Sequence, residues 1–401
     1  MTVIKPKETQ STEAPLPIST ERELARTRRP LPLIAIVGAA GKSTTGWLLT
    51  DIVEASGREV GAWLSSGVYV DRTIRNDELH AWELAVLAAR AREIDLLVQE
   101  IPSVLASRLA PDSLQIVITT SICGSDAACR RDEAAARDRA AVIQAVRALR
   151  SDGLAIANAD DLLVVHALEE GNHKSIYYAL HEANPVLRRH LEGGGSAFWV
   201  QDGWLVCSLD GKFERIVPTT SLTWALNGEL SYQLQNAMAA TAAAMAIGID
   251  IQHVRDALRS FAPDSDRLPG SSNVFETDDT RIIVDQPRST WALKHLVRAV
   301  RSTTAKRVLA VTDGLPQFDL DDLTEVGRLI GSSCGVAMIY SAAVDEARVD
   351  ALREGLASCE VPPIILVRET SFPSLAQVQA MLQPGDAGLI LLGPDRFSAA
   401  E

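Results

Sequence analysis

The stretch Leu33-Ile34-Ala35-Ile36-Val37 is followed directly by Gly38-Ala39-Ala40-Gly41-Lys42-Ser43-Thr44. The first five residues form a short apolar run, which is typical of a buried parallel strand. A helix is predicted over Thr44–Ala55, closed by Gly57. A glycine-containing turn between a strand and a helix favours phosphate binding, because backbone N–H groups and the positive end of the helix dipole point to it.

Lys42 and Ser43 give this turn its expected chemistry. A lysine here reaches the β- and γ-phosphates of a nucleotide, and the hydroxyl that follows it ligates Mg²⁺. The strict Walker spacing would put the first glycine at position 36, which is Ile36, so the loop has the shorter form G-x-x-G-K-S-T. We therefore predict that Gly38–Thr44 binds ATP with Mg²⁺ and that Lys42 is catalytic.

Strands and helices continue to alternate after this loop. Apolar runs predict strands over Leu96–Val98, Gln115–Thr120 and Leu154–Ala157, and a one-sided apolar pattern predicts a helix over Asp132–Leu149. Such βαβ units imply a parallel sheet. Three short runs separated by turns predict a small antiparallel insert, and they are Ala197–Val200, Trp204–Cys207 and Glu214–Val217.

A break in the chain predicts the domain division. Pro263, Pro269 and Gly270 interrupt the pattern, and the α/β rhythm restarts at Arg281–Asp285. We expect an α/β fold with three parts: a disordered tail over 1–30, a P-loop α/β domain with the antiparallel insert over 31–265, and a Rossmann-like α/β domain over 266–401.

Composition excludes several classes of protein. The chain has 401 residues, 47% hydrophobic and 23% charged, which argues against a fibrous or mainly disordered protein. Its net charge of −13 disfavours sequence-independent binding of nucleic acid. No secretory signal or membrane-length apolar stretch is apparent, so we expect a soluble cytoplasmic protein. Cys123 and Cys129 form the one close cysteine pair, but their spacing fits no zinc pattern, and we expect reduced thiols.

The phosphate loop resembles the G-T-N-G-K-T-T loop of the Mur ligases, ATP-dependent enzymes that join an amino acid to a carboxylate. Four more motifs of that family occur in order: Asn158-Ala159-Asp160-Asp161 as N-A-D-D, Gln235–Ala240 as Q-N-x-x-A-A, Leu268–Gly270 as the P-G-R hinge, and Ile283–Asp285 as the start of V-D-Y-A-H-N-P. The resemblance covers about 31–395. It is strongest to the C-terminal ligase half of the cyanophycin synthetases.

The resemblance implies roles for residues outside the loop. Glu100 matches the magnesium-ligating glutamate of the family, and Asn236 matches the asparagine that meets the adenine. Asp285 and Arg267, which lies close to the hinge, are implied to bind the nucleotide.

The chain departs from the family around a second metal. The expected histidine is absent from Ser121–Asp126, and Arg139 occupies the place of a lysine that is carbamylated in the family. Ser271 replaces the hinge arginine, and Gln286-Pro287-Arg288-Ser289-Thr290 replaces Y-A-H-N-P. Arg139 cannot be carbamylated in that way. We expect one magnesium, held by Ser43 and Glu100, and Arg139 is a candidate substitute for the second.

Two functions stay open at this point. The first is an ATP-dependent ligase that forms an amide from an unknown carboxylate and an unknown amine through an acyl phosphate. The alternative is a nucleotide-binding pseudoenzyme that acts as the partner of another ligase, such as a separately encoded ATP-grasp protein. A P-loop ATPase unrelated to amide synthesis is disfavoured, because it would not need Gln235-Asn236 or Pro269-Gly270.

Overall fold

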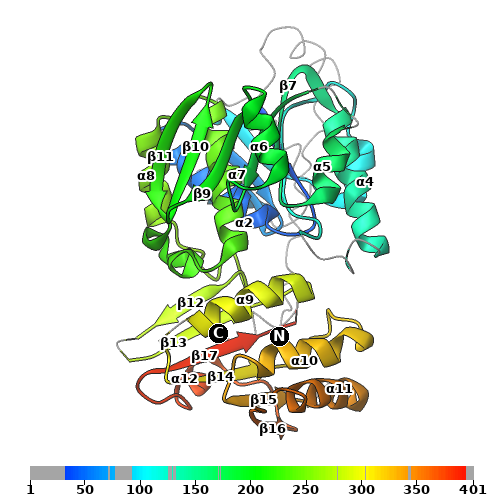
Figure 1. Ribbon diagram of the computed structural model, residues 1–401, viewed down its shortest axis with the longest axis vertical. Coiled ribbons are helices and arrows are strands. Elements are labelled where there is room, and N and C mark those ends of the chain that lie inside the picture. Colours follow the sequence, from blue (N-terminus) through cyan, green and yellow to red (C-terminus); the bar gives the residue numbers. More distant parts are fainter. Residues whose placement is uncertain are drawn as a thin grey trace, which may run out of the picture.

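The structure is a computed structural model that describes residues 32–70, 73–76, 93–124, 129, 132–169, 171, 173–277, 279–302, 304–341 and 345–393. The predicted tail over 1–30 lies outside the described residues. Two sheets organise the rest of the chain (Figure 1).

The larger sheet has eleven strands in the order β11-β10-β9-β8-β7-β6-β1-β5-β2-β3-β4. Seven of them, from β9 to β2, run parallel. The apolar runs predicted four of these seven strands, whereas the β9 segment was expected in the antiparallel insert and in fact pairs parallel with β8. The seven strands are β1 (Leu33–Val37), β2 (Val60–Leu64), β5 (Leu96–Glu100), β6 (Leu114–Thr119), β7 (Leu149–Asn158), β8 (Lys174–Ala179) and β9 (Ser196–Gln201). Their continuous apolar sequences fit burial on both faces.

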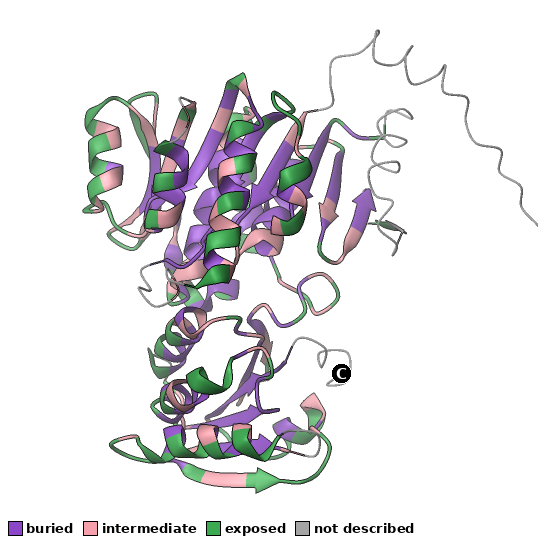
Figure 2. Ribbon diagram, turned by 90° about the vertical axis from the view of Figure 1, so that its right-hand side faces the viewer, coloured by how far each residue is buried: buried purple, intermediate pink, exposed green. Residues whose placement is uncertain are grey.

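Helices cover both faces of this sheet, so its strands are mostly buried while the helices expose their outer sides (Figure 2). One face packs against α2 (Lys42–Ala55), α7 (Ser231–Ala246) and α8 (Ile251–Ser260). The other packs against α4 (Glu133–Arg147) and α5 (Leu162–Glu169), and α6 (Pro185–Glu192) covers β8 and β9. The Ala-rich sequence of α7 lets this helix lie close to its neighbours.

The predicted antiparallel insert is present, but it extends the main sheet. β10 (Trp204–Leu209) and β11 (Lys212–Pro218) pair antiparallel beside β9. At the opposite edge β3 (Gly67–Val70) and β4 (Thr73–Asn76) form antiparallel pairs that the sequence analysis did not anticipate.

The smaller sheet follows the predicted break and has the order β12-β13-β17-β14-β15-β16. All pairs are parallel except β12–β13. The strands are β12 (Asn273–Glu276), β13 (Arg281–Asp285), β14 (Arg307–Thr312), β15 (Val336–Tyr340), β16 (Ile364–Arg368) and β17 (Asp386–Leu391). Helices α9 (Thr290–Ser302), α10 (Leu323–Gly331) and α11 (Glu346–Ala357) pack on one face, and α12 (Leu375–Gln379) lies against the other.

The two sheets meet through the start of α7 and through α9. Leu226 and Leu230, which precede α7, are buried in the same apolar cluster as Leu296 of α9. In Figure 1, α9 lies on the side of the smaller sheet that faces the larger one. The division at 265/266 itself stays a prediction. Among the described residues, no helix combines the length and the apolar character needed to span a membrane.

Candidate active site

The phosphate loop lies where the sequence predicted it, between β1 and the start of α2. Gly41 precedes the helix with a φ of 88°, and a Cβ at this position would overlap the side-chain oxygen of Asn236. Glycine is therefore required both for the left-handed backbone and for the space. The backbone N–H groups of Ala39 and Ala40 donate to the Ser121 carbonyl oxygen at 3.0 and 3.1 Å, which holds the loop against the end of β6.

The first turn of α2 is built to receive an anion. No side chain caps this helix, and its first N–H groups have no acceptor within the helix. They add to the partial positive charge of the helix N-terminus. Because the N–H groups of Ala39 and Ala40 are engaged by Ser121, the phosphate-binding prediction for Gly38–Thr44 rests on the N–H groups at the start of α2.

Lys42, Ser43 and Glu100 form one polar cluster beside the loop. The Lys42 ammonium donates to the Gly38 carbonyl oxygen at 2.8 Å and lies 3.7 Å from a Glu100 carboxylate oxygen. The Ser43 hydroxyl donates to the other Glu100 oxygen at 2.9 Å, and the Ser65 N–H donates to that same oxygen at 3.1 Å. The pairing of β5 with β1 thus brings Glu100, which lies 57 positions from Ser43 in the sequence, to the loop.

The donor set of this cluster fits magnesium. Mg²⁺ prefers hard oxygen ligands and is usually held by one or two protein groups together with substrate phosphates. Ser43 and Glu100 offer a hydroxyl and a carboxylate within 2.9 Å of each other. Within the described part of the chain there is no cluster of three or more His, Cys, Asp or Glu that could hold a metal ion by itself.

The N-A-D-D and Q-N motifs meet behind the loop. The Asn158 amide donates to the Ser121 hydroxyl at 2.8 Å, and the Gln235 amide donates to an Asp160 oxygen at 3.0 Å. The Asn236 amide donates to Gln233 at 2.9 Å. These motifs therefore connect α7 to the carboxyl ends of β6 and β7, beside the predicted phosphate site.

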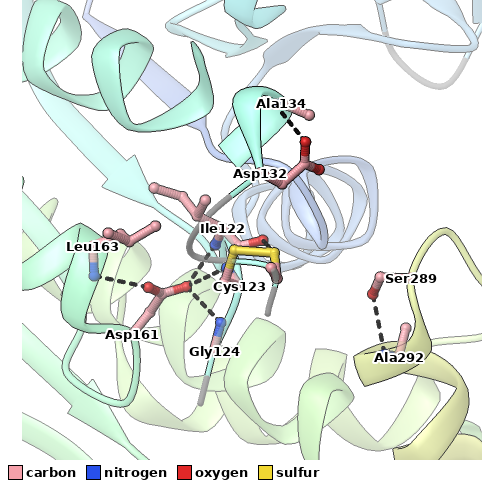
Figure 3. The surroundings of a disulfide bond; sticks show 10 residues. Ile122, Cys123, Gly124, Asp132, Ala134, Asp161, Leu163, Ser289 and Ala292 are labelled. Atoms are coloured by element: carbon pink, nitrogen blue, oxygen red, sulfur yellow. Dashed lines mark hydrogen bonds between the residues drawn. A yellow bond between two sulfur atoms is a disulfide. The ribbon is translucent and has the colours of Figure 1, made fainter. Parts of the chain in front are cut away.

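Asp161, the last residue of N-A-D-D, fixes the loop after β6. One of its carboxylate oxygens accepts the backbone N–H groups of Ile122, Cys123 and Gly124 at 2.7, 2.8 and 2.8 Å, and the other accepts that of Leu163 at 3.0 Å (Figure 3). The Asp161 side chain is fully buried. The motif thus has a structural task at this position, in addition to its place behind the phosphate loop.

The same loop corrects the expectation of reduced thiols. Cys123 is joined to Cys129 by a disulfide across six positions (Figure 3). Cys207, Cys334 and Cys359 are free. The spacing of the two cysteines matches no zinc pattern, and by itself it does not distinguish a disulfide from two free thiols.

The smaller sheet contributes the facing wall of the pocket. Asp285, at the carboxyl end of β13, accepts a hydrogen bond from the Ser272 hydroxyl at 2.7 Å, and the Tyr232 hydroxyl lies 2.7 Å from that of Ser272. Burial raises the pKa of Asp285 to about 7, although the hydrogen bonds from Ser272 oppose the shift. Burial and the nearby Asp285 charge also raise the pKa of Tyr232 well above its usual value.

A pocket that is open to solvent lies between these two walls. The described residues that line it include most of the predicted site: Ala39, Ala40, Gly41, Lys42, Ser43, Thr44, Glu100, Asn236 and Asp285. They also include Tyr232, Ser65, Arg288 and Trp291, which the sequence analysis did not assign.

Three predicted site residues are not among the described residues that line the pocket: Gly38, which belongs to the phosphate loop, and the arginines Arg267 and Arg139. The Arg267 guanidinium contacts Asp51 at 3.1 Å and Asp264 at 2.8 Å, and it stacks 4.9 Å from the ring centre of Trp47. Arg267 thereby fixes the segment before the hinge to α2. Arg139 is half-buried on α4, and neither arginine is among the described residues that line the pocket. Their assignments to the site stay predictions.

Comparison with known proteins places these features in context. No protein-family model matches the chain. A cyanophycin synthetase of Crocosphaera subtropica is 25% identical over 303 residues, which are 75% of this chain and 34% of that protein. A UDP-N-acetylmuramoylalanine–D-glutamate ligase of Alkaliphilus oremlandii is 25% identical over 243 residues, which are 60% of this chain and 46% of that protein. The chain spans about a third of the length of the cyanophycin synthetases it matches.

Solved structures show the same fold over most of the chain. A UDP-N-acetylmuramoyl-L-alanyl-D-glutamate–2,6-diaminopimelate ligase superposes with a TM-score of 0.60 at 15% identity, over 92% of this chain and 74% of the other. E. coli FolC in complex with ADP superposes with a TM-score of 0.60 at 16% identity, over 90% of this chain and 86% of the other. By sequence the chain is homologous to cyanophycin synthetase and to the Mur ligases, and it has the fold of the solved Mur ligase structures.

Proposed function

We propose that this protein binds ATP with one Mg²⁺ in the pocket between the two sheets and forms an amide between a carboxylate and an amine. The observation that carries the proposal is the cluster of Lys42, Ser43 and Glu100 at an uncapped helix N-terminus, facing a second wall across a pocket. The relatives named as ligases support the amide-forming chemistry.

The proposed reaction has two balanced steps. A substrate carboxylate oxygen attacks the γ-phosphorus, the bond to the β–γ bridging oxygen breaks, and ADP leaves, so an acyl phosphate forms. The amine then attacks the acyl carbon, the C–O bond to phosphate breaks, and phosphate leaves while the amine loses a proton. The protein mainly positions the reactants and stabilises negative charge.

Each residue of the cluster has a defined part in this proposal. The N–H groups at the start of α2 and the Lys42 ammonium hold the β- and γ-phosphates. Ser43 and Glu100 hold Mg²⁺, which neutralises phosphate charge when bound. Asn236 and Asp285 contact the rest of the nucleotide. We propose a cytoplasmic location, because the reaction requires ATP.

The decisive experiment traps the first intermediate. The protein is incubated with ATP, Mg²⁺, hydroxylamine and a panel of amino acids, diacids and acidic peptides, and hydroxamate is measured together with ADP. Stoichiometric hydroxamate and ADP with one class of carboxylate support the ligase and identify that class. Nucleotide binding without turnover across the panel argues against it.

A second candidate function is a nucleotide-binding pseudoenzyme that serves another ligase, for instance a separate ATP-grasp protein. It is favoured by the arginine at 139, which stands where the family has a lysine that is carbamylated. This alternative predicts ATP binding with no hydroxamate in the trapping experiment. Under this alternative the wild type has no ATP turnover, so Arg139→Ala changes only nucleotide binding.

A further inference from the structure

The pocket is poor in positive charge for a triphosphate ligand. Among the described residues that line it, the cationic side chains are Lys42 and Arg288. Lys42 is already engaged by the Gly38 carbonyl and the Glu100 carboxylate. Phosphoryl transfer spreads negative charge over the γ-phosphate oxygens, and a cation near them stabilises that charge. Arg288 is the cation of this lining that has no described partner.

The backbone on both sides of Arg288 is anchored. The carbonyl of Pro287 accepts a hydrogen bond from the Gln317 amide at 3.0 Å, and the Ser289 hydroxyl accepts the Ala292 N–H at 3.2 Å, at the start of α9. Gln286 donates its N–H to the Gly270 carbonyl at 2.8 Å. The loop from β13 to α9 therefore holds the Cα of Arg288 at the rim of the pocket, while its side chain stays exposed.

The chemistry of the side chain suits the γ-phosphate. A guanidinium is always charged and binds phosphate oxygens through two parallel hydrogen bonds. Arg288 lies on the wall opposite the phosphate loop, so a γ-phosphate that has Lys42 on one side would have Arg288 on the other. Arg139, which the sequence favoured for this charge, is not among the described lining residues.

We propose that Arg288 binds the γ-phosphate of the nucleotide held by Gly38–Thr44, and that the C-terminal sheet thereby distinguishes ATP from ADP. This inference rests on the proposed nucleotide site. Arg288 takes the place of the histidine in the family loop Y-A-H-N-P and gives this position a permanent positive charge.

Calorimetry with ADP and with a non-hydrolysable ATP analogue, both with Mg²⁺, tests the proposal. Arg288→Ala is expected to weaken binding of the ATP analogue by about 10- to 100-fold, as loss of a charge-assisted hydrogen-bond pair does, and to change ADP binding less than about threefold. Arg288→Lys should restore part of the loss. Arg301→Ala, at the far end of α9, is the matched control and should bind both ligands like the wild type.

The outcomes separate this inference from the proposed function. Equal losses for ADP and the ATP analogue, or no loss for either, would overturn the role of Arg288 while leaving the nucleotide site intact. A wild-type protein that binds neither ligand would overturn the nucleotide site and Arg288 together. Thermal denaturation of each variant checks the fold, and an exposed arginine without a described partner should change the melting temperature little.

Discussion

The two walls of the pocket are built in different ways. The phosphate-loop wall combines Gly38–Thr44 with Glu100, which β5 brings beside the loop, and its charges are paired through Lys42, Ser43 and Glu100. The wall from the C-terminal sheet holds a buried network around Asp285 and a cation, Arg288, that has no partner among the described residues.

The phosphate loop follows the family pattern, but departures from that pattern occur on both sides of the pocket: the histidine is missing after β6 and Arg139 replaces a lysine on the side of the larger sheet, and Ser271 and Arg288 replace family residues on the side of the smaller one. We therefore predict that the loop binds a nucleotide and that the steps beyond the phosphates differ from those of the family.

The largest expected effect lies in the phosphate-loop wall. Lys42→Ala should weaken ATP binding by about 100-fold, because a charge-assisted contact to phosphate is lost. Titration calorimetry with ATP and Mg²⁺ measures this, and Lys294→Ala, an exposed lysine on α9, is the control. An unchanged affinity in the Lys42 variant would show that Lys42 does not bind ATP. The two walls would then not differ in function as proposed.

Asp161 tests the loop that lies between the walls. Asp161→Ala leaves the backbone N–H groups of three consecutive residues without their acceptor, so we expect the free energy of unfolding to fall by about 3 kcal/mol or more. Chemical denaturation measures the change. Asp152→Ala, at an exposed carboxylate, should stay within about 0.5 kcal/mol of the wild type. A similar small change at Asp161 would show that its hydrogen bonds do not stabilise the fold.

Asp285 should make the stability of the protein depend on pH. Its pKa is raised by burial to about 7, so between about pH 4 and pH 7 the folded state keeps a proton that the unfolded state has released. The contribution of this group to stability is therefore full at low pH and declines as pH rises through that window. Asp285→Asn should flatten the decline.

The melting temperature from pH 4 to pH 8, compared between wild type and Asp285→Asn, measures this effect. Other titrating groups contribute to both proteins and cancel in the comparison. Parallel curves for the two proteins would mean that Asp285 is ionised in the fold, and that the two walls do not differ in this respect.

The disulfide is expected to have the smallest effect. Because it closes a short loop, replacing both Cys123 and Cys129 by serine should lower the free energy of unfolding by about 2 kcal/mol. Dithiothreitol should have the same effect on the wild type and none on the double variant. Two free thiols at these positions in the untreated protein, found by mass spectrometry, would contradict the pairing.

The sequence predicted those elements that depend on short, continuous stretches of residues. The strand, loop and helix around Gly38–Thr44 follow from apolar patterning and glycine placement, and the second α/β sheet follows from the restart at Arg281–Asp285. The edge strands β3 and β4 were missed, because short strands at a sheet edge depend on their neighbours more than on their own residues. That β10 and β11 would extend the main sheet is a matter of long-range pairing, which local patterns do not fix.

The residues of the candidate site also fall into those that the sequence identified and those that depend on contacts between distant segments. Glu100 and Asp285 were assigned to the site from the resemblance to the Mur ligases, which supplied their roles through matching motifs. Arg288 was quoted only as part of a lost motif, although its position just after β13 was a usable signal. The partners of Arg267 on α2 and the disulfide of Cys123 depend on contacts between distant segments, which one sequence does not reveal.

The central claim is that the pocket holds ATP with a single Mg²⁺ at Ser43 and Glu100. A crystal structure with a non-hydrolysable ATP analogue and Mn²⁺ tests it most directly through the anomalous scattering of manganese. We predict one strong peak between Ser43, Glu100 and the phosphates, with the triphosphate on the N–H groups at the start of α2. Two strong peaks beside the γ-phosphate, or a nucleotide bound away from Gly38–Thr44, would contradict the account.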